Sequence, residues 1–184
     1  MKKLNYAIVA LFFIVGMSAC GQNQNHEEAN ELQLSSLQKG GSFNACKGIT
    51  ENNFRETFNI PSDYVLGDVE AFNVMPEMSC VMAAGKDGKQ LAIMVSMMAN
   101  PSTYDFVATR VKEEFSTAPE EDKIKGLGEF AIYRENRTRK ESALVVFQDK
   151  HIISIAFDHS NTYEKEQLKE MMQNFYKKWL KLQS

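Results

Sequence analysis

The sequence predicts an α+β domain in which helices pack against a mostly antiparallel sheet. Three observations favour this fold class. Apolar runs of strand length follow one another across short turns, which indicates hairpins rather than crossovers. A long amphipathic helix is predicted at the C-terminus. An apolar fraction of 43% and a charged fraction of 24% are typical of a globular protein, and 184 residues allow one substantial core.

The N-terminal segment, residues 1–19, has the pattern of a cleaved secretory signal. Lys2 and Lys3 precede the apolar stretch Tyr6–Met17, and Ser18-Ala19 supply small residues before Cys20. This stretch is shorter than the roughly 20 residues that span a bilayer. Met17-Ser18-Ala19-Cys20 resembles the bacterial lipobox, in which Leu is usual at the position of Met17.

The lipobox resemblance implies that Cys20 carries a diacylglyceryl thioether and an N-acyl chain. Two or more acyl chains anchor a protein stably to a membrane. Gly21, where an Asp would indicate retention in the inner membrane, favours the outer membrane, with the domain periplasmic or surface-exposed. The alternative is an ordinary signal peptide that leaves Cys20 as a free thiol.

Residues 20–41 are predicted to be a lipidated flexible tether, because Gln, Asn, Glu, Ser and Gly dominate them. The globular domain is predicted at residues 42–184. Loss of Lys2 and Lys3 with the signal changes the formal charge from −3 to about −5. Such a charge gives no electrostatic reason to expect nucleic acid as a partner.

The first half of the domain is predicted to be a short helix and three strands. Thr50 is a candidate N-cap for a helix that ends before Pro61. An irregular strand is expected within residues 64–74. The apolar runs 78–84 and 90–98 flank an Asp-Gly step, which predicts an antiparallel hairpin.

The second half is predicted to be a helix, three strands and a closing helix. Asn100-Pro101 starts a helix with Tyr104, Val107, Val111 and Phe115 on one face, and a charged loop follows Pro119. Strands are expected at 130–133, 143–147 and 152–157. Asn161 or Thr162 then caps a helix with a continuous apolar stripe made of Leu168, Met171, Met172, Phe175, Trp179 and Leu182.

Cys46 and Cys80 are the remaining cysteines, and an even pair in an oxidising compartment predicts a disulfide. Closing this loop is worth roughly 3 to 4 kcal/mol in the loop-entropy treatment. Two alternatives stay open. The cysteines could bind a metal with His151 or His159, although the spacing is not that of a structural zinc site, or they could remain reduced thiols.

No catalytic constellation is apparent, and no cofactor or metal is predicted. His26, His151 and His159 are scattered and expected to be exposed to solvent. Gly126-Leu127-Gly128 lacks the third glycine of a dinucleotide fingerprint and is interpreted as a turn. If the protein is an enzyme, Glu129, Asp158 and His159 are the candidate residues of a diffuse site.

Two further clusters have both a binding and a structural interpretation. Arg134, Arg137, Arg139 and Lys140 could bind acidic polymers or lipid headgroups, or could line a solvated strand edge. The methionines near the hairpin could form a surface for a soft metal or an apolar partner, but filling gaps in the core is the favoured interpretation. They are Met75, Met78, Met82, Met94, Met97 and Met98.

Residues 44–182 resemble uncharacterised lipoproteins, best populated in actinobacteria, and through them PsbP-like domains. The resemblance is carried by Cys46 before a short helix, Cys80 opening the central hairpin, Gly126-Leu127-Gly128 before a strand, an antiparallel pair and a long last helix. It implies a sheet flanked by helices and a non-catalytic role. Of site residues it implies only the cysteine pair.

These observations lead to one functional hypothesis and two alternatives. We expect a membrane-anchored extracytoplasmic lipoprotein that acts as a binding or accessory module of the cell envelope, with a protein, glycan or lipid as its partner. The alternatives are an envelope enzyme with a diffuse active site and a purely structural envelope lipoprotein.

Overall fold

The computed structural model describes residues 44–98, 101–148, 151–160 and 162–183. The predicted signal 1–19, the lipidation site Cys20 and the tether 20–41 lie outside the described residues. The helices are α1 (Glu51–Phe58), η2 (Glu70–Phe72), α2 (Pro101–Thr117), η3 (Glu120–Asp122) and α3 (Lys165–Gln183). The strands are β1 (Val65–Leu66), β2 (Ser79–Lys86), β3 (Lys89–Met98), β4 (Lys123–Ile124), β5 (Phe130–Asn136), β6 (Glu141–Gln148) and β7 (His151–Asp158).

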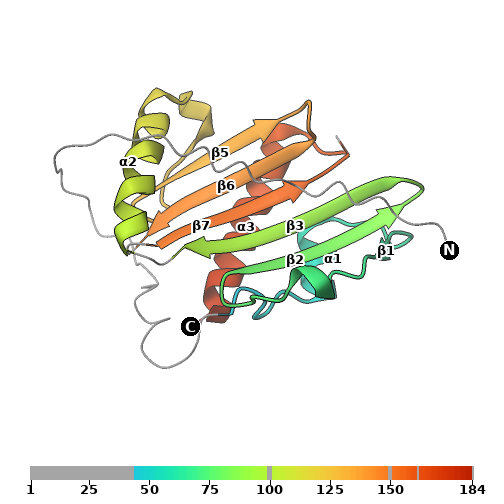
Figure 1. Cartoon of the computed structure of the whole chain (residues 1–184). Coiled ribbons are helices and arrows are strands. Elements are labelled where there is room, and N and C mark those ends of the chain that lie inside the picture. The colour runs from blue at the N-terminus through green and yellow to red at the C-terminus, as the bar shows by residue number, and fades with distance from the viewer. Residues whose placement is uncertain (1–43, 99–100, 149–150, 161, 184) are drawn as a thin grey trace.

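The seven strands form one antiparallel sheet in the order β1-β2-β3-β7-β6-β5-β4, which confirms the predicted α+β class (Figure 1). The β2–β3 hairpin turns on two residues with positive φ, Asp87 at 49° and Gly88 at 80°. A two-residue turn of this kind matches the twist of the flanking strands. The pairing of β3 with β7 then joins the two halves of the chain.

One face of the sheet is covered by α1 and α3 (Figure 1). Leu91, Ile93 and Val95 of β3 alternate toward this face and are almost completely buried. The Phe58 and Phe157 rings stack with centroids 4.4 Å apart. The main core therefore lies between the sheet and these two helices.

Of the α-helices in the described ranges, α2 packs on the opposite face, at one end of the sheet (Figure 1). Ala108 and Val111 of α2 pack on Val145, Phe147 and Ile152. This second cluster is small, and no other α-helix of the described residues packs on that face. We call this surface the α2 face.

The predicted N-terminal cap and hairpin are confirmed. The Thr50 side chain accepts a hydrogen bond from the Asn53 amide at 3.2 Å and starts α1. Strands β5, β6 and β7 are longer than predicted, because polar residues at their ends continue the ladder. The candidate caps Asn100 and Asn161 lie outside the described residues.

Three expectations about local structure are wrong. Residues 64–74 form only the two-residue β1 and the turn η2, because the Asp68 side chain accepts from the Glu70 amide and bends the chain. The charged loop after Pro119 contains η3 and β4. The last helix starts at Lys165, since the buried Tyr163 side chain first turns into the core and donates to the Phe58 carbonyl.

Among the helices of the described ranges, none combines the length and the apolar character needed to cross a bilayer.

Candidate functional site: a groove on the α2 face

The two cysteines are joined. Cys46 precedes α1 and Cys80 lies in β2, and their sulfur atoms are bonded with the Cα atoms 4.9 Å apart. The predicted disulfide is therefore present, and neither the metal-binding nor the reduced alternative describes this pair. Within the described part of the chain, no three His, Cys, Asp or Glu side chains are grouped so that they could hold a metal ion.

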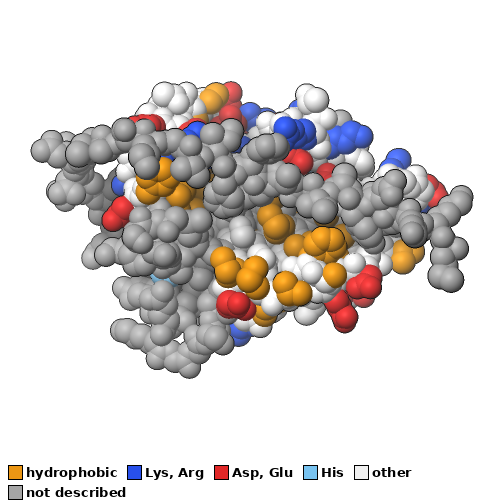
Figure 2. Space-filling view, viewed as in Figure 1, with side chains coloured by type: hydrophobic (Ala, Val, Ile, Leu, Met, Phe, Trp, Pro, Cys, Tyr) orange, Lys and Arg blue, Asp and Glu red, His pale blue; other side chains and the backbone are white. Residues whose placement is uncertain are grey.

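The α2 face contains a groove of about 310 Å³ that crosses five strands. Its floor is made of small and apolar side chains from strands β2, β3, β6 and β7: Val81, Ala83, Ala92, Met94, Ala143 and Ala156. Figure 2 shows apolar side chains gathered over the β2 side of this face, with acidic side chains beside them. A concave apolar surface of this size is the usual form of a small-molecule site.

Strand register places the polar residues of the groove at one end. In one row across the sheet, Ala83, Ala92, Asp158, Glu141 and Asn136 are successive partners. The groove thus changes from an apolar floor on β2 and β3 to two neighbouring carboxylates on β7 and β6.

The neighbouring row provides the space of the groove. Its successive partners are Val81, Met94, Ala156, Ala143 and Arg134. The two adjacent alanines in the middle of this row leave space above the sheet, which larger side chains would fill.

The carboxyl group of Asp158 is a weaker acid than an ordinary aspartate. Burial, and secondarily the charge of Glu141, raises the pKa of Asp158 from 3.8 to about 6, while Lys140 acts in the opposite direction. Like charges directly opposite each other on adjacent strands destabilise a sheet. In the described part of the chain, no hydrogen bond or ion pair holds either carboxylate.

The η2 segment forms one wall of the groove through Val69 and Phe72. The Asn73 side chain fixes this segment to β2 with a pair of hydrogen bonds. Its side-chain amide donates to the Val81 carbonyl at 3.0 Å, and its oxygen accepts from the Val81 amide at 2.7 Å. The wall is therefore positioned by two hydrogen bonds to the floor.

The basic run, which could bind acidic polymers or lipid headgroups or line a solvated strand edge, is divided among several contacts. Arg134 lines the groove and pairs with Glu114 of α2 at 2.5 Å. Arg137 pairs with Glu135 at 2.8 Å and donates to the Tyr163 carbonyl at 3.1 Å. These pairings neutralise much of the charge that an acidic ligand would need.

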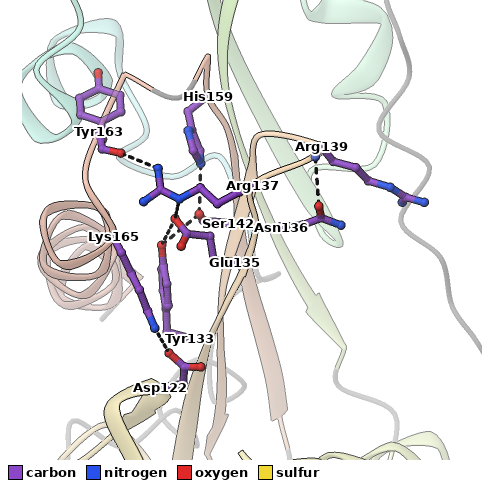
Figure 3. Close-up of polar contacts among 10 residues, drawn as sticks. All are labelled: Asp122, Tyr133, Glu135, Asn136, Arg137, Arg139, Ser142, His159, Tyr163 and Lys165. Carbon is purple, nitrogen blue, oxygen red and sulfur yellow. Dashed lines mark hydrogen bonds and ion pairs between the residues drawn. The ribbon is translucent and has the colours of Figure 1, made fainter. Parts of the chain in front are cut away.

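A buried polar cluster lies on the core side of the same strands (Figure 3). His159 is 0% exposed and Ser142 is 2% exposed, with Ser142 Oγ 3.2 Å from His159 Nε2. Tyr133 donates to Ser142 Oγ at 3.0 Å. Burial, and secondarily the charge of Arg137, lowers the pKa of His159 to about 4, so the ring is neutral at physiological pH.

This Ser–His pair is a structural contact, because both side chains are almost completely buried. The expected exposure of His151 and His159 is wrong, since both are buried. A neutral, hydrogen-bonded imidazole is tolerated in a core, and His159, the residue after β7, contacts Ser142 there. His26 lies outside the described residues.

The three candidate residues of an enzyme site are not brought together. Asp158, the last residue of β7, lines the groove, whereas His159 follows that strand and is buried against Ser142. Glu129 is exposed just before β5, at the end of that strand remote from Asn136. Only Asp158 belongs to the groove.

Met75, Met78, Met82 and Met94 do not form a common surface, and the side chains of Met97 and Met98 lie outside the described part of the structure. Met94 lines the groove and Met82 packs against the main core, whereas Met75 and Met78 are exposed. Gap-filling in the core therefore describes Met82 but not Met75 or Met78.

The alanines and Glu141 were missed as site residues from the sequence. The signal for Ala92 and Ala156 is a small residue between two large apolar ones, as in Leu91-Ala92-Ile93 and Ile155-Ala156-Phe157. Such alternation indicates a strand with one packed face and one hollow face.

The sequence matches no protein-family profile, and no curated protein or solved structure is significantly similar to the chain.

Proposed function

We propose that this chain is a lipid-anchored lipoprotein of the bacterial cell envelope whose domain binds a small, largely apolar ligand in the groove on the α2 face. The observation that carries the binding role is the groove itself. It has a volume of about 310 Å³, an apolar floor and polar residues at one end. A purely structural lipoprotein does not require such a feature.

The anchor is proposed from the sequence. Met17-Ser18-Ala19-Cys20 follows a basic and an apolar segment, as in lipoprotein precursors. The Cys46–Cys80 disulfide supports this location, because disulfides persist in oxidising compartments outside the cytoplasm. We also propose a PsbP-like arrangement of the domain, supported by an antiparallel sheet with helices on both faces.

Calorimetric titration tests the binding role. The purified protein, carrying Cys20→Ser so that no acyl chain competes, is titrated with octan-1-ol, octylamine and octanoate. We expect at least one of these probes to bind, and Ala156→Phe to abolish binding by filling the floor. Ser116→Phe is the matched control, because Ser116 is exposed on α2 and does not line the groove. If no probe binds, the proposed function is refuted.

An enzyme is the second candidate, and Asp158 is the observation that favours it. A carboxyl group with a raised pKa in a groove, beside a second carboxylate, is a common arrangement for acid–base catalysis. A turnover assay against a panel of envelope esters and glycosides tests this candidate. Activity that is lost in Asp158→Asn and retained in Glu56→Gln would support catalysis, and the absence of turnover leaves the binding role as the better account.

A further inference from the structure

We propose that the ligand of this groove is a cationic amphiphile, with its ammonium group between Asp158 and Glu141 and its apolar body on the alanine floor. This inference rests on the proposed function and specifies the class of ligand. Strand register, the ion pairing of the nearby basic residues and the apolar floor of the groove support it.

The two carboxylates are forced together by the sheet. Asp158 and Glu141 are direct partners in the β6–β7 register, and both line the groove. Each side chain is half-buried, so water screens their repulsion less than it would on an open surface. A cation placed between them would remove this repulsion and gain two charge-assisted hydrogen bonds.

In the described part of the chain, no basic residue forms an ion pair with either carboxylate, although the charge of Lys140 partly offsets their repulsion. Arg134 lies in the neighbouring row and is paired with Glu114 of α2. Lys140 precedes Glu141 at the β5–β6 turn and has an exposed side chain. Two residues are strand partners of Asp158, namely Ala92 of β3 and Glu141 of β6. Gln90 and Asn136 also line this end of the groove. None of these four residues carries a positive charge.

An organic cation fits the site better than a metal ion. Calcium takes six to eight oxygen ligands and magnesium six, and in the described part of the chain no three His, Cys, Asp or Glu side chains are grouped to hold a metal ion. The adjoining floor of Ala92, Ala156, Ala143 and Met94 is apolar and leads directly away from the carboxylates. An alkyl or aryl group attached to the ammonium would be buried there, at about 25 cal/mol per Å² of apolar surface.

The same geometry predicts that binding weakens in acid. Because the pKa of Asp158 is raised to about 6, a proton neutralises this carboxyl group as the pH falls below that value. The ammonium group then loses one of its two partners. A neutral ligand of the same length would not respond in this way.

A comparison of three probes of equal chain length tests the inference. With the protein carrying Cys20→Ser, we expect octylamine to bind about tenfold more tightly than octan-1-ol, and octanoate to bind most weakly. Asp158→Asn and Glu141→Gln should each remove most of the preference for octylamine, with little change for octan-1-ol. Glu56→Gln on α1 makes the same charge change on the other face of the sheet and should have no effect.

The outcomes separate the two proposals. If octan-1-ol or octanoate binds as tightly as octylamine and Ala156→Phe abolishes that binding, the groove is a ligand site but the cationic preference is wrong. If none of the probes binds, the proposed function fails and the inference fails with it. Both substitutions remove a repulsion, so weaker octylamine binding by a stably folded variant would not reflect unfolding.

Discussion

Asp158→Asn should stabilise the fold in neutral solution and leave it unchanged in acid. The folded chain holds the Asp158 carboxyl beside Glu141, with its pKa raised from 3.8 to about 6. Below the ordinary value this group is protonated in both folded and unfolded chains, and it costs nothing. As the pH rises toward 6 the unfolded chain ionises first, so the folded state loses stability, and the full penalty is present above that value.

The magnitude follows from the size of this change in pKa. A rise from 3.8 to about 6 corresponds to at most about 3 kcal/mol. Because the carboxyl lines an open groove, solvent screening reduces this to roughly 1 to 1.5 kcal/mol. Asp158→Asn should therefore raise the free energy of unfolding by that amount at about pH 7.5 and by close to zero at about pH 3.5.

Urea denaturation at the two pH values measures this difference directly. For a typical small protein the expected gain moves the unfolding midpoint by roughly 0.5 M urea at the higher pH. Glu56→Gln is the control for a change in net charge, since Glu56 is exposed on α1. An Asp158→Asn variant that is no more stable than the parent, or equally stabilised at both pH values, would refute the reasoning.

Three further experiments test how the groove and its frame are held. Replacing both Cys46 and Cys80 by Ala removes a cross-link between residues 34 positions apart and should lower the free energy of unfolding by about 3 to 4 kcal/mol, measured in urea; an unchanged midpoint would contradict this. Asn73→Ala removes two hydrogen bonds to β2 and should cost about 1 to 2 kcal/mol, with faster amide exchange at Val81; unchanged exchange would count against the clamp. Gly128→Ala would place a Cβ 2.3 Å from the Phe147 carbonyl oxygen and should cost roughly 2 to 4 kcal/mol by thermal melting, whereas Gly126→Ala, which meets no atom within 4 Å, should cost only about 1 kcal/mol. Equal losses for the two glycines would show that the close approach is unimportant.

Local signals in the sequence were sufficient for much of the fold. Thr50 and Pro61 delimit α1, and the Asp-Gly step predicts the β2–β3 turn, because these residues act on their own backbone. The closing helix was predicted from its apolar stripe, although its first turn was placed too early. The cysteine pair needed only an even count and an oxidising compartment.

The groove could not be predicted in the same way, because it depends on long-range register. Ala92 meets Asp158 only because β7 inserts between β3 and β6, and no local pattern specifies that order. Asp158 and Glu141 become neighbours for the same reason. The alternation of small and large residues marks the hollow face of each strand, but the carboxylate pair appears only when the sheet is assembled.

Burial of polar side chains was the other point that the sequence left undetermined. His159 was expected in solvent because the three histidines are scattered along the sequence and form no evident site. In the structure the buried Ser142 hydroxyl lies within hydrogen-bond distance of both the Tyr133 hydroxyl and the His159 ring. The neutral imidazole of His159 can therefore be buried there. Such a network is specified jointly by β5, β6 and β7.

Mass spectrometry of the native protein, extracted from membranes of its own cells, tests the central claim of a lipid-anchored module most directly. The account predicts an N-terminal residue Cys20 that carries a diacylglyceryl group, with residues 1–19 removed. A protein that retains residues 1–19, or a Cys20 without bound fatty acid, would contradict it.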